Sequence, residues 1–138
     1  MTVVGPEKGR TYQSKHGYEV RSEASPEEID IASQNVLVIP GGFAPDRLRR
    51  YDSVLNLVRE ANSKGIVIAA ICHAAWVAIS AGITKGKRMT CVKAVKDDLV
   101  NSGADYVDKE LVIDGNIITS RTPADLPVFV KGIIEAVK

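Results

Sequence analysis

The fold is decided by the stretch Ile66-Val67-Ile68-Ala69-Ala70-Ile71-Cys72-His73. Its first six residues are apolar at every position, which is typical of a parallel β-strand that helices cover on both faces. The chain stays largely apolar from 74 to 81 and then reaches Gly82, a residue type that commonly ends a helix. The stretch therefore predicts a buried strand that turns directly into a buried helix, with Cys72 at the junction.

The same alternation occurs just upstream. Residues 35–39 form a β-branched run that a Pro-Gly-Gly sequence stops, and residues 46–63 place apolar side chains near one helical face. A strand, a crossover helix and a parallel strand form a right-handed unit almost without exception, so the carboxyl ends of both strands should point the same way. Gly41, Gly42 and Cys72 are therefore predicted to share one edge of the sheet, where open α/β sheets bind ligands.

The remaining predicted elements are shorter. We expect strands at 88–92, 111–113 and 117–119, the last two joined by an Asp-Gly hairpin turn, and helices at 96–102 and from Pro123 onward. The first thirty residues hold two short strand candidates, 2–4 and 18–20, and a helix start at 25–28. The alternation as a whole predicts an α/β fold.

The composition is typical of one soluble globular domain, which we place at residues 1–138: 45% of the residues are hydrophobic, 25% are charged and the net charge is +1. Lys and Arg are interleaved with Asp and Glu, so we expect neither a nucleic acid nor a membrane as a partner. The longest apolar run is shorter than the roughly 20 residues that cross a bilayer. Two cysteines are too few for a disulfide framework, which predicts a reducing, cytoplasmic location.

Cys72 is the first candidate for chemistry. A side chain at a sharp strand-to-helix turn is displayed at the edge of the sheet, and the positive end of the following helix favours thiolate, the nucleophilic form, over thiol. The alternative is a buried structural cysteine, because cysteine is often buried without any function. From the local sequence alone both interpretations of Cys72 stay open.

The neighbours of Cys72 fit acyl chemistry. Gly41 and Gly42 allow backbone N–H groups to approach a substrate oxygen, and the N–H of His73 is a further donor, so the three predict an oxyanion hole. The imidazole of His73 is a candidate general base and acid. The alternatives are that both glycines serve only the turn and that His73 hydrogen-bonds a nearby carbonyl group.

Cys91 and His16 fit structural roles, one in a predicted strand and the other in a turn. Two histidines without clustered ligands predict no metal site, and no phosphate-binding loop is present, so we expect no cofactor.

Four segments in order resemble the motifs of the ThiJ/PfpI family: Val38-Ile39-Pro40-Gly41-Gly42, Ala69-Ala70-Ile71-Cys72-His73, Lys96-Asp97-Asp98 and Ser120-Arg121-Thr122-Pro123-Ala124-Asp125-Leu126. The resemblance runs from about Gly9 to the carboxyl end. Within the family, the chain is most similar to the PfpI-type intracellular protease branch. The resemblance implies a flavodoxin-like three-layer sandwich with a mainly parallel sheet, related to class I glutamine amidotransferase domains. It also implies self-association as a dimer or a hexamer.

The resemblance implies a catalytic triad of Cys72, His73 and Asp46, with the aspartate supplied by a neighbouring subunit. Asp46 stands where the family branch prefers the longer glutamate, and Val92 stands where relatives often place tyrosine or histidine. Relatives also begin with an extra strand and helix that carry a glutamate close to the cysteine. We therefore expect the domain to be shortened at its amino end, with Met1 an internal start or a truncation point.

The leading hypothesis from the sequence is a cysteine-dependent hydrolase, similar to PfpI-type proteases, that acts on peptides or small carbonyl substrates. A glyoxalase III or deglycase that acts on methylglyoxal or its adducts is the first alternative, and this activity requires the glutamate of the extra segment. The second is a non-enzymatic, redox-responsive stress protein with chaperone-like behaviour, in which Cys72 oxidises.

Overall fold

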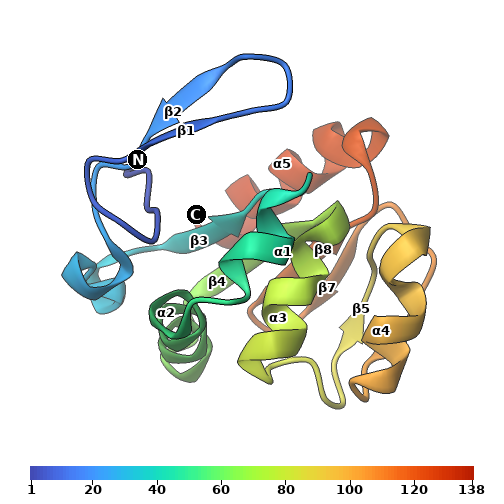
Figure 1. Ribbon diagram of the computed structural model, residues 1–138. Helices are drawn as coiled ribbons and strands as arrows, with labels where there is room; N and C mark the ends of the chain where they lie inside the picture. The colour runs from blue at the N-terminus through green and yellow to red at the C-terminus, as the bar shows by residue number, and fades with distance from the viewer.

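A four-stranded sheet in the order β3-β4-β8-β7 forms the centre of the computed structural model, which describes residues 1–138 (Figure 1). The strands β3 (Val36–Ile39), β4 (Val67–Ile71) and β8 (Ile117–Ser120) are parallel, and β7 (Val112–Asp114) is antiparallel to β8. The mainly parallel sheet and the predicted hairpin are both confirmed. β3 pairs with β4 alone and is an edge strand of this sheet.

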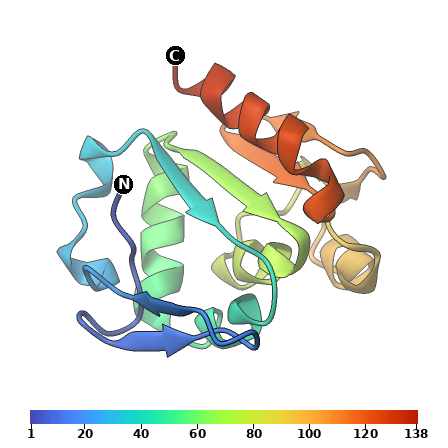
Figure 2. The same ribbon diagram turned by 90° about the horizontal axis from the view of Figure 1, so that it is seen from above.

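Helices cover both faces of the sheet, as Figure 2 shows. One face carries α2 (Asp52–Ser63) and α3 (Ala75–Ala81), with α1 (Ala44–Leu48) and α4 (Lys96–Asn101) packed against α3, whereas α5 (Leu126–Ala136) lies on the other face. The larger core cluster joins the first face to α2 and α3, and a smaller one packs Phe129 of α5 against Ala69, Ile71 and Ile118. The predicted flavodoxin-like three-layer sandwich is therefore confirmed.

Short elements surround the sandwich. The strands β1 (Thr11–Gln13) and β2 (Glu19–Arg21) form an antiparallel hairpin that projects from the body in Figure 1, and β5 (Arg88–Met89) pairs in parallel with β6 (Asp105–Tyr106). Five 3₁₀ turns connect the larger elements: Pro26–Glu28, Ile31–Ser33, Cys72–Ala74, Lys93–Val95 and Pro123–Asp125. No helix has the length and apolar character that a membrane span requires.

Three of the predicted elements are wrong in extent. The helix expected at 46–63 is two helices, because Tyr51 adopts an extended conformation (φ −104°, ψ 114°) between α1 and α2. The strand expected at 88–92 ends at Met89, and the N–H of Thr90 then donates to the side-chain hydroxyl of Thr119 in β8 instead of to a backbone carbonyl group. Residues 2–4 contribute only the isolated bridge between Val4 and Ala24.

Unequal burial within the central sheet predicts an unequal response to two substitutions of the same type. We expect Ile68→Ala to lower the free energy of unfolding by about 2–5 kcal/mol, since Ile68 is 0% exposed and its removal leaves a cavity in the core. Ile113→Ala is the matched control, because Ile113 lies in the same sheet but is 51% exposed, and it should change stability by less than about 1 kcal/mol. Urea unfolding measures both, and equal losses would contradict the described core.

Candidate active site

Cys72 lies on a strained turn between β4 and α3. It has a φ of +64° and is the one residue other than glycine with a positive φ in the chain. A left-handed conformation costs a side-chain-bearing residue about 1–3 kcal/mol, and such strain concentrates at functional sites. The thiol is free and half-buried. The structure therefore displays this sulfur at a sharp elbow, as the sequence predicts.

The strand register brings three turns together at this edge of the sheet. Ile39 pairs with Ala70, and Ile71 pairs with Ser120, so the residues that follow β3, β4 and β8 lie side by side. The backbone of Gly41 passes so close to the elbow that a Cβ atom there would lie 2.8 Å from the Cβ of Cys72 and 3.0 Å from the carbonyl oxygen of Ile71. Gly41 is therefore required by this close approach.

His73 is the polar neighbour of the thiol. Its Nδ1 lies 3.3 Å from the Sγ of Cys72, and this is the one hydrogen bond of the imidazole within the chain. In the neutral tautomer with a bare Nδ1, the ring accepts the S–H proton, and an N–H at that position donates to the thiolate. The pair can therefore exchange a proton and generate the nucleophilic sulfur.

Asp46 is not joined to His73 within one chain. It lies in α1, where its carboxylate pairs with Arg50, and the Nε of Arg50 also donates to the main-chain oxygen of Asp46 at 3.1 Å. Gly42 follows Gly41 with a φ of +77°, outside the close contact with the thiol. The structure thus brings together Cys72, His73 and Gly41, and the role of Asp46 stays a prediction.

The second cysteine and the other predicted structural residues take no part in the Cys72–His73 contact. Burial first, and then the charges of Cys72 and Asp98, raise the pKa of Cys91 to about 12, so this buried thiol stays protonated near neutral pH. His16 lies exposed in the β1–β2 turn, where its backbone N–H donates to Ser14. Val92 packs against the larger core cluster. No group of three or more His, Cys, Asp or Glu side chains is arranged to hold a metal ion.

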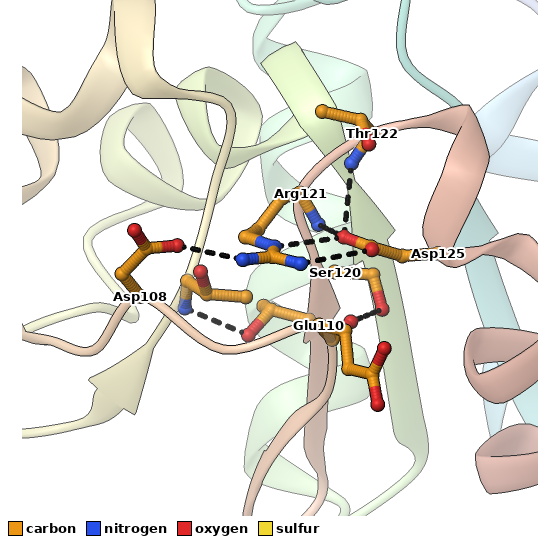
Figure 3. A network of polar contacts seen from close by, with 8 residues as sticks. Asp108, Glu110, Ser120, Arg121, Thr122 and Asp125 are labelled. Carbon is orange, nitrogen blue, oxygen red and sulfur yellow. Dashed lines mark hydrogen bonds and ion pairs between the residues drawn. The ribbon is translucent and has the colours of Figure 1, made fainter.

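An arginine network fixes the turn after β8, next to the elbow (Figure 3). Arg121 binds Asp125 through Nε at 3.0 Å and Nη2 at 3.1 Å, and it binds Asp108 through Nη1 at 2.9 Å. The backbone N–H groups of Arg121 and Thr122 also donate to Asp125, which is only 4% exposed. Sequence reasoning gave this network no role, although the Thr-x-x-Asp capping pattern is a recognisable signal.

The network shifts the pKa values of its members in opposite directions. The hydrogen bonds from Arg121 hold the pKa of Asp125 below its usual range, and the same pairing raises the pKa of Arg121. A lowered folded-state pKa stabilises the fold above the ordinary carboxyl value of about 4, and this stability is lost as the pH falls through the lowered value.

We therefore expect Asp125→Asn to lower the urea midpoint at pH 7 and to weaken the acid dependence of that midpoint below about pH 4. Asp105→Asn is the control, since Asp105 forms an exposed ion pair with Arg88 at 3.1 Å that should contribute less than about 1 kcal/mol. Urea unfolding at several pH values measures both effects. An Asp125→Asn protein with the wild-type acid dependence would contradict this assignment.

The contact at Gly41 generates a second prediction. Gly41→Ala should lower the free energy of unfolding by about 1–3 kcal/mol and slow iodoacetamide alkylation of Cys72, because the added methyl displaces the elbow. In Gly132→Ala the new Cβ meets only the ends of two side chains, Leu111 at 3.1 Å and Ile113 at 3.8 Å, so this helical control should be neutral or stabilising. Thermal unfolding and alkylation kinetics measure the two variants. Unchanged alkylation in Gly41→Ala would refute the close approach.

Comparison with known proteins adds relatives that match most of the chain. A family model described as the DJ-1/PfpI family matches residues 1–136. The "Deglycase PH1704" of Pyrococcus horikoshii is 37% identical over 93% of this chain and 77% of its own length, and the "Deglycase PfpI" of Pyrococcus furiosus is 36% identical over 99% and 81%. A crystal structure of a two-domain protein from Anabaena variabilis with a DJ-1/ThiJ/PfpI-like domain superposes with a TM-score of 0.94. It is 38% identical and covers 97% of this chain and 39% of that protein.

These names correct the leading functional hypothesis. The PfpI branch suggested a cysteine protease, but the Pyrococcus furiosus protein that carries the name PfpI is itself called a deglycase, as is the Pyrococcus horikoshii relative. The peptidase interpretation is therefore wrong, and the deglycase alternative fits better. The predicted resemblance is confirmed by the model match, the sequence identities and the superposition: the chain belongs to the DJ-1/PfpI family.

Proposed function

We propose that this protein is a Cys72-dependent deglycase that releases amines or thiols from the adducts they form with methylglyoxal. The observation that carries the proposal is the Cys72–His73 contact of 3.3 Å on a strained elbow, in a chain whose relatives bear the name deglycase. A free, half-buried thiol also suits a reducing compartment.

The chemistry follows from the geometry. His73 takes the Sγ proton through Nδ1, and the thiolate adds to the electrophilic carbon of the adduct. The oxygen on that carbon gains negative charge, which backbone N–H groups of Gly42 and His73 would stabilise. The bond from the neighbouring carbon to nitrogen or sulfur then breaks as the hydroxyl on that carbon becomes a carbonyl group, and the protonated imidazole gives its proton to the departing amine or thiol. The proton of that hydroxyl passes to the oxyanion. Collapse of the resulting hemithioketal breaks the C–S bond, releases methylglyoxal and restores the thiol of Cys72.

We also propose that the site is completed by self-association, with Asp46 of a neighbouring subunit orienting His73. Support comes from the imidazole, which makes no hydrogen bond to a carboxylate of its own chain, and from the position of Asp46 in the helix that packs against the elbow turn. The exposed pair with Arg50 leaves Asp46 within reach of a second chain.

The first prediction of the proposal concerns the nucleophile. Cys72→Ser should reduce adduct breakdown to about a hundredth of the wild-type rate or less, because a hydroxyl is a far weaker nucleophile than a thiolate at neutral pH. Cys91→Ser is the matched control and should retain activity, since Cys91 is buried and stays protonated. The substrate is a preformed adduct of methylglyoxal with N-acetyl-lysine, and amine release is followed by amine-reactive labelling.

The kinetics separate a deglycase from an enzyme that only consumes free methylglyoxal. A deglycase accelerates adduct breakdown in proportion to enzyme concentration, beyond the spontaneous rate at which the adduct dissociates. An enzyme that acts on free methylglyoxal cannot exceed that spontaneous rate, however much is added. A plateau at the spontaneous rate would therefore rule out the proposed function.

The contribution of Asp46 has its own test. Asp46→Asn should lower the turnover rate about tenfold or more, because an amide orients and stabilises an imidazolium less well than a carboxylate. Asp52→Asn, at the exposed start of α2, is the control and should act as wild type. Mixing Asp46→Asn with Cys72→Ser subunits should restore part of the activity if the triad forms between chains, and no recovery in a mixed oligomer would contradict it.

A further inference from the structure

The chain contains a single tryptophan, and it lies against the proposed general base. Trp76 follows His73 by three residues, so one helical turn places the two rings on the same side. Their centroids are 5.1 Å apart and their planes meet at 59°, a tilted aromatic contact. The half-buried indole thus packs directly against the imidazole.

The indole is itself held from two further helices. Its Nε1–H donates to the Oδ2 of Asp98 in α4 at 2.8 Å. The guanidinium of Arg49, at the end of α1, lies 5.7 Å from the centroid of the indole, and its Nε donates to the Oγ of Ser80 at 2.9 Å. Figure 1 shows α3 between α1 and α4, so both contacts reach Trp76 from flanking elements. The position of the indole is therefore determined by three helices.

The imidazole, in contrast, has little else to hold it. Its one polar contact within the chain is the 3.3 Å contact with the Sγ of Cys72. A rotation of the ring by 180° would move Nδ1 away from the sulfur and place a carbon atom there. Packing against a fixed indole limits this rotation, as the supporting residues of designed sites do.

We propose that Trp76 is a positioning residue for His73, and that Asp98 and Arg49 act through the indole to keep Nδ1 on the Sγ of Cys72. The inference rests on the proposed function only in taking Cys72 and His73 as the reacting pair. Its test requires no substrate, so the positioning role and the deglycase activity can fail separately.

The contact itself is tested by intrinsic fluorescence. A protonated imidazole quenches an adjacent indole more strongly than a neutral one, so emission should fall as the pH is lowered and histidine side chains take up protons. His73→Gln should abolish this transition, whereas His16→Gln and Cys72→Ser should retain it. A transition that is absent in the wild type, or that survives in His73→Gln, would overturn the proposal.

The positioning role is tested by the pH profile of Cys72 alkylation with iodoacetamide in a Cys91→Ser background. Trp76→Ala should slow alkylation near pH 7 about tenfold and give the profile of His73→Gln, because the displaced imidazole no longer supports the thiolate. Trp76→Phe keeps an aromatic wall and should restore most of the wild-type profile. A folded Trp76→Ala protein with the wild-type profile would overturn the proposal.

Asp98→Ala provides a second route that does not disturb the core, since Asp98 is exposed and its removal only frees the indole N–H. It should shift the alkylation profile in the same direction as Trp76→Ala, by a smaller amount. Asp97→Ala, on the same turn of α4 but without this contact, is the matched control and should match the wild type. Equal profiles for the two aspartate variants would contradict a role for Asp98.

Discussion

The parallel pairing of β3, β4 and β8 is the constraint on which the rest of the structure depends. Because the three strands run in the same direction and in a fixed register, their carboxyl ends open at one edge of the sheet. Gly41, Cys72 and Arg121 follow these ends, so residues separated by up to eighty positions become neighbours through backbone hydrogen bonds alone.

Much of this arrangement could be predicted from the sequence. A run of six apolar residues that ends in Cys-His specifies a buried strand and an elbow, and Pro-Gly-Gly specifies the turn beside it, since these signals are local. The break between α1 and α2 could not be predicted. Arg49, at the end of α1, is a good helix former, and the position of its side chain depends on contacts with Ser80 and Trp76 in α3, far away in the sequence. The same holds for the end of β5, where a side chain of β8 takes the place of a strand partner.

The candidate site also has parts that the sequence reveals and parts that it does not. Cys72 and His73 are adjacent in the chain, and their contact follows from the turn that they form. The Arg121–Asp108 and Trp76–Asp98 hydrogen bonds join separate elements, so no spacing in the sequence reveals them. The Arg121–Asp125 pair is local, four residues apart, and the capping pattern of Thr122 and Asp125 signals it. Reaction type is harder still, because an activated thiol at a strand-to-helix elbow can attack many electrophilic carbons and the fold does not choose among them. The names of the relatives, not the elbow, separated a deglycase from a peptidase.

The left-handed conformation of Cys72 sets stability and chemistry against each other at one position. Glycine adopts a φ of +64° without steric penalty, so a chain with no use for a thiol would become more stable by exchanging this cysteine for glycine. Stability alone therefore favours glycine over cysteine at this turn. The presence of cysteine at position 72 is not explained by backbone stability, which is consistent with a use for its sulfur.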